Sequence, residues 1–327
     1  MKKASWVLAM LALGAVVFGT MLAVAQKKYT IALIPGLTTD GFYITMHKGA
    51  QEAAKKLGVT LIFQGGPEFS PTTQIPVLNA IIARKPDAIL IAPTDKQQLI
   101  APLKKAHDAG IKIITVDTFI GDNGNYQTGS GNADFPLSYV ASDNVEGGRI
   151  AARALAKAIG EKGKVYVSNV KPGISTTDQR EQGFKEEMKK YPNITVLETQ
   201  FNDDDANKAA SQLAAVLARN PDLAGVFGAN LFSAQGAANG VKNAGKRGKI
   251  RVAAFDCPES IINDIKGGTI DMAICQHPAD MGRIGVQYAV DALNGKKIPT
   301  RYGTGYTVID QANVNSAEAK AAIYSSK

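Results

Sequence analysis

The stretch KIITVD at residues 112–117 is an apolar run that ends in an aspartate, and IRVAAFD at residues 250–256 repeats the pattern. A Pro-Asp pair lies upstream of each run, within 85–87 and 220–222, and introduces a strand, a helix and the strand that ends in the aspartate. Self-similarity over such a distance is typical of a duplicated structural unit. The chain is therefore expected to contain two similar units.

Short runs rich in Val and Ile alternate with longer amphipathic stretches such as 42–57, 147–159 and 179–190. This alternation is typical of βαβ units and a parallel sheet. The fold class expected is α/β, with two similar doubly wound parallel-sheet lobes. The candidate strands are 29–34, 59–63, 88–92, 112–116, 164–169, 194–198, 225–228, 250–255 and 269–275.

Asp117 and Asp256 end matching strands of the two units. In open parallel sheets, ligands bind at the carboxyl ends of the strands. If the two lobes face each other, both carboxylates meet across one cleft, which can close by hinge bending.

The amino terminus has the features of an export signal. Lys2 and Lys3 precede an apolar run over 6–24 that ends in Ala23-Val24-Ala25. We expect a signal peptide over 1–25, cleaved after Ala25, and a periplasmic protein. The alternative is an uncleaved membrane anchor, because the run approaches the ~20 residues that span a bilayer. No Cys stands near the cleavage site, which excludes a lipid-anchored mature terminus.

The formal net charge of +8 comes from Lys and Arg that are dispersed among acids. A basic protein can bind nucleic acid, but export and the lack of a basic cluster argue against such a partner and favour a solvated surface.

The two cysteines, Cys257 and Cys275, could form a disulfide in an oxidising compartment or remain two buried thiols.

Several classes of site are not supported by the sequence. His47, His107 and His277 are scattered without a His or Cys partner at ligand spacing, so no metal site is expected. No phosphate loop, dinucleotide fingerprint or nucleophile turn is present, and no cofactor is expected. Asp117 and Asp256 could serve as the acid and base of a glycosidase. Against a glycosidase, the same residues suit sugar binding, because carboxylates accept hydrogen bonds from hydroxyls while Arg and Asn donate them, and nothing in the sequence marks one carboxylate as unusually buried.

Nine stretches carry a resemblance to a known family: 40–43, 48–51, 92–95, 116–117, 141–144 with 147–148, 180–184, 229–230, 255–256 and 274–276. In their order and spacing they resemble the periplasmic sugar-binding proteins of the ribose-binding type, which have the type I periplasmic binding protein fold and are related to the lac-repressor effector domain. The resemblance covers nearly all of the mature chain.

The resemblance implies a set of ligand-binding residues: Asp40, Phe42, Tyr43, Asp117, Arg180, Asn230, Asp256 and Gln276. The family implies that Phe42 and Tyr43 stack on the ligand. It implies that Asp117 and Asp256 bind hydroxyls of the ligand. Arg180 and Asn230 are expected to donate hydrogen bonds, and Gln276 to lie at a crossover between the lobes. Alternatively, the aromatic pair packs at the start of a helix and Arg180 forms a surface salt bridge.

Together with the repeat boundaries, the resemblance implies an N-terminal lobe of 26–142 plus 277–304 and a C-terminal lobe of 143–276 plus 305–327. Three hinge segments are expected, near 142–143, 276–277 and 304–306.

Departures from the ribose-binding pattern bear on the ligand. Thr118 stands where ribose binders carry Arg, Ala92 where they carry Asn, and Asp204 near the position of a stacking aromatic, with Phe201 as a possible substitute. We therefore expect a small sugar other than ribose (another pentose, a hexose or a deoxysugar) or a polyol, with a furanose-like signalling molecule as the alternative.

The function expected is that of a monomeric, non-catalytic binding component that delivers its ligand to the permease of an ABC-type importer. The alternatives are a sensory protein that presents its ligand to a chemoreceptor or kinase, and an exported glycosidase. A transcription factor is disfavoured because no helix-turn-helix precedes the first strand.

Overall fold

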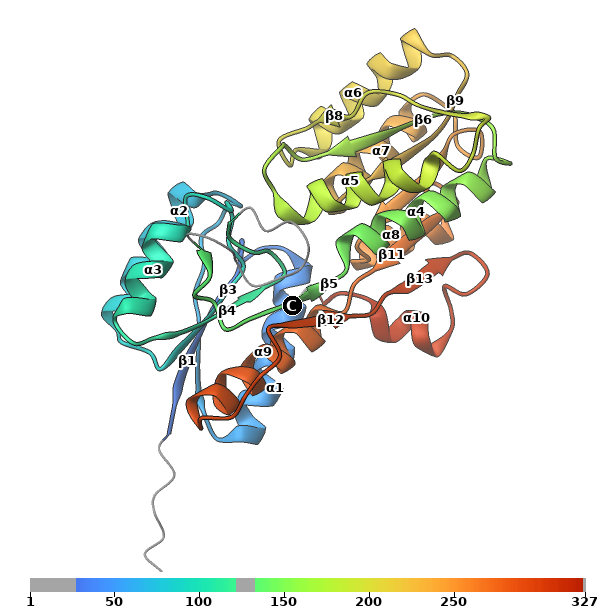
Figure 1. The fold of residues 1–327 in the computed structure, drawn as a ribbon. Coiled ribbons are helices and arrows are strands. Elements are labelled where there is room, and N and C mark those ends of the chain that lie inside the picture. The colour runs from blue at the N-terminus through green and yellow to red at the C-terminus, as the bar shows by residue number, and fades with distance from the viewer. Residues whose placement is uncertain (1–27, 122–132, 326–327) are drawn as a thin grey trace, which may run out of the picture.

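The computed structural model describes residues 28–121 and 133–325, and the predicted signal peptide over 1–25 lies outside these residues. The described chain folds into two lobes, each built on one sheet with helices on both faces (Figure 1). The expected α/β fold class with two parallel-sheet lobes is confirmed. Among the described residues, no helix has the length and apolar character needed to cross a bilayer.

The sheet of the first lobe has the strand order β12-β5-β4-β3-β1-β2, and all its neighbours are parallel. Its strands are β1 (Thr30–Ile34), β2 (Thr60–Phe63), β3 (Ala88–Ile91), β4 (Lys112–Val116), β5 (Ser138–Ser142) and β12 (Arg301–Thr304). Helices α1 (Gly41–Leu57) and α9 (Pro278–Leu293) cover one face, and α2 (Pro71–Ala83) and α3 (Ile100–Asp108) cover the other.

The apolar runs of this sheet are continuous because both faces are buried. Successive side chains of β1 belong to two different hydrophobic cores. Ile31 and Leu33 pack on the α1 side of the sheet, whereas Ala32 and Ile34 pack on the α2 side. This period of two is what a strand imposes.

The sheet of the second lobe has the matching order β13-β11-β10-β9-β6-β7, with β8 paired to β6. Its edge strand β13 runs antiparallel to β11, whereas the other neighbours are parallel. Its strands are β6 (Gly163–Asn169), β7 (Ile194–Val196), β8 (Gln200–Phe201), β9 (Leu223–Gly228), β10 (Arg251–Phe255), β11 (Met272–Cys275) and β13 (Thr307–Asp310). Helices α4 (Asn144–Ala158) and α5 (Ser175–Met188) lie on one side. Helices α6 (Ala206–Arg219), α7 (Leu231–Asn243) and α8 (Glu259–Lys266) lie on the other, and α10 (Ala317–Ala322) packs on β13.

Two predicted strands are shorter in the structure by two or more residues: 194–198, of which β7 keeps Ile194–Val196, and 269–275. The apolar pattern over 269–275 predicted a strand, but β11 begins only at Met272. The turn that ends α8 takes up the preceding residues, since Gly268 has a φ of 70° and the Thr269 N–H bonds to the Asp264 carbonyl.

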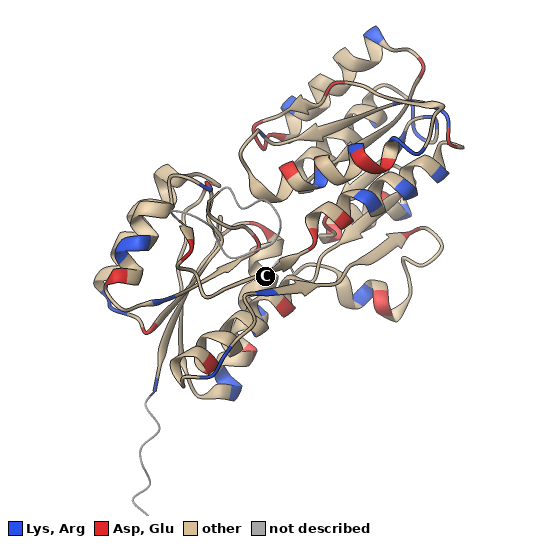
Figure 2. Cartoon of the chain, viewed as in Figure 1, with Lys and Arg blue, Asp and Glu red and all other residues tan. Residues whose placement is uncertain are grey.

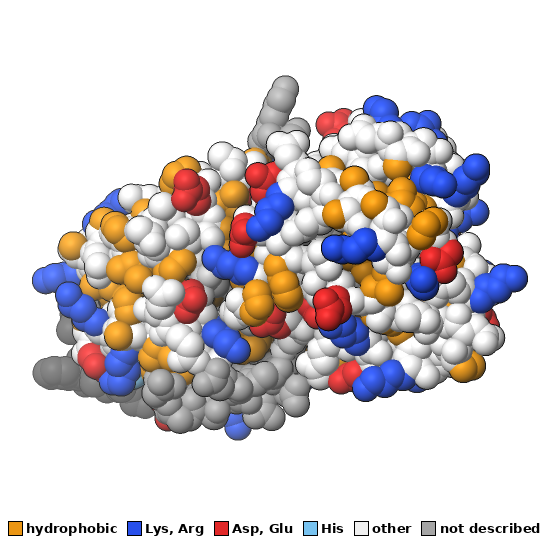
Figure 3. Space-filling model, turned by 90° about the horizontal axis from the view of Figure 1, so that it is seen from above, with side chains coloured by type: hydrophobic (Ala, Val, Ile, Leu, Met, Phe, Trp, Pro, Cys, Tyr) orange, Lys and Arg blue, Asp and Glu red, His pale blue; other side chains and the backbone are white. Residues whose placement is uncertain are grey.

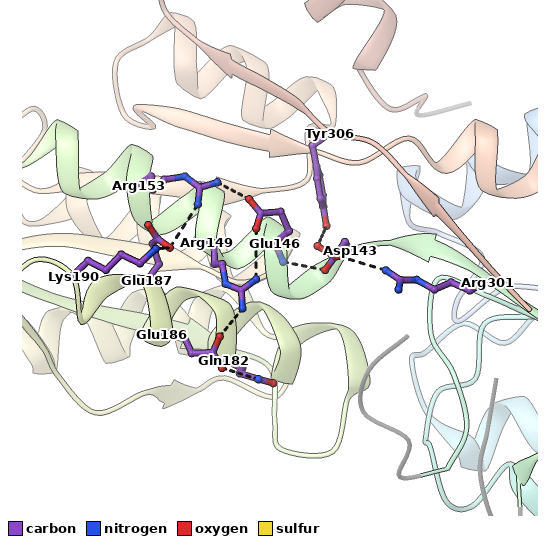
Figure 4. Close-up of polar contacts among 10 residues, drawn as sticks. All are labelled: Asp143, Glu146, Arg149, Arg153, Gln182, Glu186, Glu187, Lys190, Arg301 and Tyr306. Atoms are coloured by element: carbon purple, nitrogen blue, oxygen red, sulfur yellow. Dashed lines mark hydrogen bonds and ion pairs between the residues drawn. The ribbon is translucent and has the colours of Figure 1, made fainter. Parts of the chain in front are cut away.

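The chain passes between the two sheets after β5, after β11 and between β12 and β13. The first and third passages lie side by side, because the Ser142 and Thr304 hydroxyls are 3.1 Å apart. The second joins them at His277, whose Nε2 lies 3.0 Å from the Thr307 hydroxyl. Asp143 accepts a hydrogen bond from the Tyr306 hydroxyl on its carbonyl and lies 3.5 Å from the Arg301 guanidinium (Figure 4). Cys257 and Cys275, which the sequence left open, form a disulfide beside this junction.

Charged side chains lie mainly on the outside of the helices. Both signs are dispersed along the ribbon and mix on the face shown in space-filling form (Figures 2 and 3). On α4 and α5, Arg149 pairs with Glu186 and Arg153 with Glu146 (Figure 4). Exposed pairs of this kind contribute about 0–1 kcal/mol each, so the helices are held together chiefly by their buried faces.

Candidate ligand-binding site

A cavity lies between the two lobes, at the carboxyl ends of both sheets. Its walls contain all eight residues that the resemblance implied: Asp40, Phe42, Tyr43, Asp117, Arg180, Asn230, Asp256 and Gln276. They are joined by residues that the sequence did not single out for ligand binding: Leu37, Phe69, Val170, Ile174, Thr176, Thr177, Asp204 and Leu231. The lobes also contact each other where the Phe119 N–H lies 3.5 Å from the Ser175 hydroxyl.

Asp117 and Asp256 occupy equivalent places in the two lobes. They follow β4 and β10, and both have a left-handed backbone, with φ of 62° and 73°. Each N–H bonds to the neighbouring strand, Asp117 to the Val140 carbonyl and Asp256 to the Ile274 carbonyl, at 3.0 Å in both cases. Asp tolerates this conformation better than most residues. The turn directs both side chains out of the sheets and into the cavity.

Asp117 is 6% exposed and accepts a 2.7 Å hydrogen bond from the Tyr43 hydroxyl on Oδ2. Burial raises the pKa of this carboxyl to about 6, and the charge of Arg180 and the bond from Tyr43 oppose the rise. The Tyr43 hydroxyl is therefore committed to orienting Asp117, while the Tyr43 side chain still lines the cavity.

Arg180 is the guanidinium of the cavity and is only 3% exposed. Its Nε donates to Asn144 Oδ1 at 2.8 Å, its Nη1 donates to the Ala229 carbonyl at 2.9 Å, and it lies 3.8 Å above the Phe255 ring centre. Its Nη1 is 4.0 Å from Asp256 Oδ2. The alternative of a surface salt bridge is therefore wrong for this residue.

The close packing of α4 on α5 sets the position of Arg180. A Cβ on Gly148 would lie 2.0 Å from the Arg180 carbonyl oxygen, and a Cβ on Gly183 would lie 1.9 Å from that of Val145. In the first lobe, Gly49 meets the Ala279 carbonyl in the same way, at 1.9 Å. Glycine at these positions lets the two helices approach backbone to backbone.

Two further carboxyls, Asp40 and Asp204, are half-buried at the cavity wall. Asp40 caps α1 by accepting from the Phe42 N–H at 2.9 Å. Burial raises its pKa to about 7, against the bond from Phe42, and the nearby aspartates add to the rise. Burial also raises the pKa of Asp204, and Asp256 adds to this effect. The described walls of the cavity thus carry four carboxyls and one guanidinium, and burial favours the neutral form of Asp40, Asp117 and Asp204.

Asn230 and Gln276 hold two of these carboxyls. Asn230 caps α7 through the Ser233 N–H and donates to Asp204 Oδ1 at 2.6 Å. Gln276 donates to Asp256 Oδ1 at 2.8 Å. The side-chain amide of Asn230, which was expected to donate to a ligand, therefore already donates to a neighbouring carboxyl.

Two oxygen atoms of the cavity residues are buried and have no hydrogen-bond partner among the described residues: Gln276 Oε1 and Thr177 Oγ1. Unsatisfied buried polar atoms are costly, and a ligand with hydroxyl groups could satisfy both. Thr177 was missed because it precedes the helix predicted over 179–190, whereas in the structure it lies in the first turn of α5. Among the described residues, no group of three His, Cys, Asp or Glu side chains could hold a metal ion.

The apolar part of the cavity wall comes from Leu37, Phe42 and Phe69 on the first lobe and Val170, Ile174 and Leu231 on the second. Phe42 lines the cavity and also packs edge-on against Tyr43 at the start of α1. Phe201, suggested as a substitute stacking aromatic, does not line the cavity, whereas Asp204 does.

Comparison with known proteins places this geometry in a family. Residues 31–297 match the model of the periplasmic binding protein domain. The chain is 31% identical to the ribose import binding protein of Salmonella typhimurium over 92% of this chain and 96% of that protein. It is 30% identical to the D-allose-binding periplasmic protein of Escherichia coli over 88% of this chain and 92% of that protein.

Two solved structures of solute-binding proteins have the same fold as this chain. An ABC transporter solute-binding protein of Agrobacterium vitis, bound with α-D-tagatopyranose, has a TM-score of 0.89 and 68% identity, covering 91% of this chain and 100% of that one. A carbohydrate transporter solute-binding protein of Agrobacterium radiobacter, in complex with D-arabinose, has a TM-score of 0.83 and 29% identity, covering 91% and 100%. The chain therefore belongs to the periplasmic binding protein family.

Proposed function

We propose that this protein is the periplasmic solute-binding component of an ABC-type importer, which encloses one small neutral sugar between its lobes and delivers it to the membrane permease. The observation that carries the proposal is the meeting of Asp117 and Asp256, one from each sheet, with Arg180 in one buried cavity. A sugar held by groups from both lobes stabilises the closed form, since closure alone completes the site.

Each kind of side chain in the cavity has its own role in sugar binding. Asp117 and Asp256 accept hydrogen bonds from sugar hydroxyls, and Arg180 donates to a hydroxyl or ring oxygen. Phe42 and Phe69 offer phenyl surface to the apolar C–H side of the ring. Thr177 and Gln276 contribute the two buried oxygens that lack a protein partner among the described residues.

We propose a ketohexopyranose as the ligand, with D-tagatose as the first candidate. The Agrobacterium vitis protein, at 68% identity, was solved with α-D-tagatopyranose. Ribose is a weaker candidate, because Thr118, Ala92 and Asp204 replace residues of the ribose-binding pattern. Asp204 brings a carboxyl into the cavity, which suits a ligand with additional hydroxyls.

We propose that the lobes comprise residues 26–142 with 277–304 and residues 143–276 with 305–327, and that they hinge about the three connecting segments. Closing the lobes on a sugar reduces the radius of gyration, which small-angle scattering can follow. We also propose cleavage after Ala25 and a monomeric mature protein. Mass spectrometry and size-exclusion chromatography of the exported protein test these two points.

A thermal-shift screen tests the proposed function, with D-tagatose, D-allose, D-ribose and D-arabinose as the panel. A ligand at 100 times its Kd stabilises the native state by about 2.7 kcal/mol. We expect the largest shift with D-tagatose. The proposal would be refuted if no sugar, from this panel or beyond it, changed the melting temperature at millimolar concentration. Release of product from common glycosides would instead support the glycosidase alternative, which the binding-protein names of the relatives do not favour.

A further inference from the structure

Tyr324, just after α10, lies behind the wall of the cavity and is only 2% exposed. Its hydroxyl accepts a hydrogen bond from the Gln276 N–H at 2.9 Å and donates one to Asp256 Oδ1, also at 2.9 Å. Burial, with the charge of Asp256 next in effect, raises the pKa of Tyr324 well above its usual value. The hydroxyl therefore stays protonated and acts as a permanent donor to the carboxylate.

This donor decides which oxygen of Asp256 is available. Oδ1 receives both the Tyr324 hydroxyl and the Gln276 amide, at 2.9 and 2.8 Å. Within 28–121 and 133–325, the one partner of Oδ2 is the distant Arg180 Nη1, at 4.0 Å. With Oδ1 occupied by two donors, the carboxylate is held in one orientation and Oδ2 remains free for a hydroxyl of a bound sugar.

The Tyr324 ring extends the connection into the first lobe. It packs edge-on against Phe42 with ring centres 5.7 Å apart, and Phe42 packs edge-on against Tyr43 at 5.1 Å. The Tyr43 hydroxyl in turn donates to Asp117 Oδ2 at 2.7 Å. A row of three aromatic rings therefore joins the two cavity carboxylates of opposite lobes.

The backbone around Tyr324 is tied to both lobes. The Tyr324 N–H bonds to the Cys257 carbonyl in the second lobe at 3.1 Å. The Ser325 N–H donates to the Thr45 hydroxyl at 2.7 Å, and Lys48 donates to the Ser325 hydroxyl at 2.5 Å, both on α1 of the first lobe. The chain after α10 thus returns to the junction of the lobes (Figure 1).

We propose that Tyr324 is a positioning residue of the ligand site, which orients Asp256 directly and links it to Asp117 through Phe42 and Tyr43. The inference rests on the proposed function, because it names a residue that acts on the same site without lining the cavity.

Calorimetric titration of Tyr324→Phe with D-tagatose tests the proposal. The variant keeps the ring and removes both bonds of the hydroxyl, the one to Asp256 and the one from the Gln276 N–H. Because the first of these joins a charged group, we expect the Kd to rise roughly tenfold to a hundredfold. Tyr166→Phe is the matched control, because the Tyr166 hydroxyl is buried and has no hydrogen-bond partner among the described residues. Its Kd should equal that of the wild type. An unchanged Kd in Tyr324→Phe would overturn the proposal.

A double-mutant cycle separates positioning from general destabilisation. If Tyr324 acts through Asp256, Tyr324→Phe should change the Kd by less than about threefold in the Asp256→Ala background. Equal losses in both backgrounds would mean that Tyr324 acts elsewhere, and the proposal would be wrong.

A crystal structure of Tyr324→Phe without sugar decides the question even if the Asp256→Ala background binds too weakly to titrate. The proposal predicts that the Asp256 carboxylate turns away from its wild-type orientation, and an unchanged orientation contradicts it. A wild-type protein that binds no sugar would refute the proposed function, whereas the orientation of Asp256 would still test Tyr324.

Discussion

Replacing Asp117 with asparagine should weaken sugar binding and, at the same time, make the sugar-free protein more stable at alkaline pH. The asparagine keeps an acceptor for the Tyr43 hydroxyl, which now bonds to Asp117 Oδ2 at 2.7 Å. It replaces the other oxygen, which faces the cavity, with a donor. Losing one charge-assisted bond of about 1.5–3 kcal/mol raises the Kd by roughly ten to a hundredfold.

The gain in stability follows from the raised pKa of this carboxyl. Burial raises it from 3.8 to about 6, so the ionised group costs the folded protein up to roughly 3 kcal/mol, at 1.36 kcal/mol per pKa unit. Because the folded pKa lies above the unfolded one, this cost is fully present above about pH 6 and absent below about pH 4. The variant should therefore melt higher than the wild type at pH 8 and at the same temperature at pH 3.5.

Calorimetric titration with D-tagatose and melting curves of the sugar-free protein at pH 3.5 and pH 8 check both effects. Asp222→Asn is the matched control, since that side chain is 63% exposed and pairs only with Lys164 among the ion pairs of the described residues. Wild-type affinity in Asp117→Asn, or a lower melting temperature than the wild type at pH 8, would refute the role given to Asp117.

Three further substitutions have defined outcomes. Arg180→Gln should raise the Kd for D-tagatose at least a hundredfold and lower the melting temperature, because Asn144 and Ala229 lose a buried donor; wild-type affinity would exclude Arg180 from the site. Gly148→Ala should destabilise the protein by several kcal/mol in denaturant titration, since its Cβ would lie 2.0 Å from the Arg180 carbonyl; unchanged stability would contradict the close helix packing. Burial raises the pKa of Asp40 to about 7, so the sugar-free wild type should lose stability as the pH rises from 4 through about 7. In Asp40→Asn this loss should be smaller. Parallel stability profiles of variant and wild type against pH would show that Asp40 is not desolvated.

The duplicated fold could be predicted from local patterns because each lobe repeats the same strand order. Strands such as β4, Lys112–Val116, are buried on both faces and therefore consist almost entirely of β-branched residues. The strand β12 could not be found in this way. Its residues Arg301 and Tyr302 are exposed and it lies at the edge of its sheet, so only pairing with β5 defines it.

Some residues of the candidate site could likewise be predicted from local sequence patterns, and others could not. Asp117 and Asp256 were predictable because each ends an apolar strand, and the sheet brings such strand ends together. Thr177 and Phe69 were not, because their places in the cavity depend on how the lobes meet. Tyr324 was not predictable either, since its partners Asp256 and Phe42 are 68 and 282 residues away in the sequence. A contact over that distance leaves no local pattern.

The central claim is that one sugar binds between Asp117 and Asp256, and a crystal structure of the protein grown with saturating D-tagatose tests it most directly. The account predicts one sugar ring in the cavity, with hydroxyls within hydrogen-bonding distance of both carboxylates and of Arg180. A sugar bound elsewhere with the cavity empty, or a ring that contacts only one lobe, would contradict it.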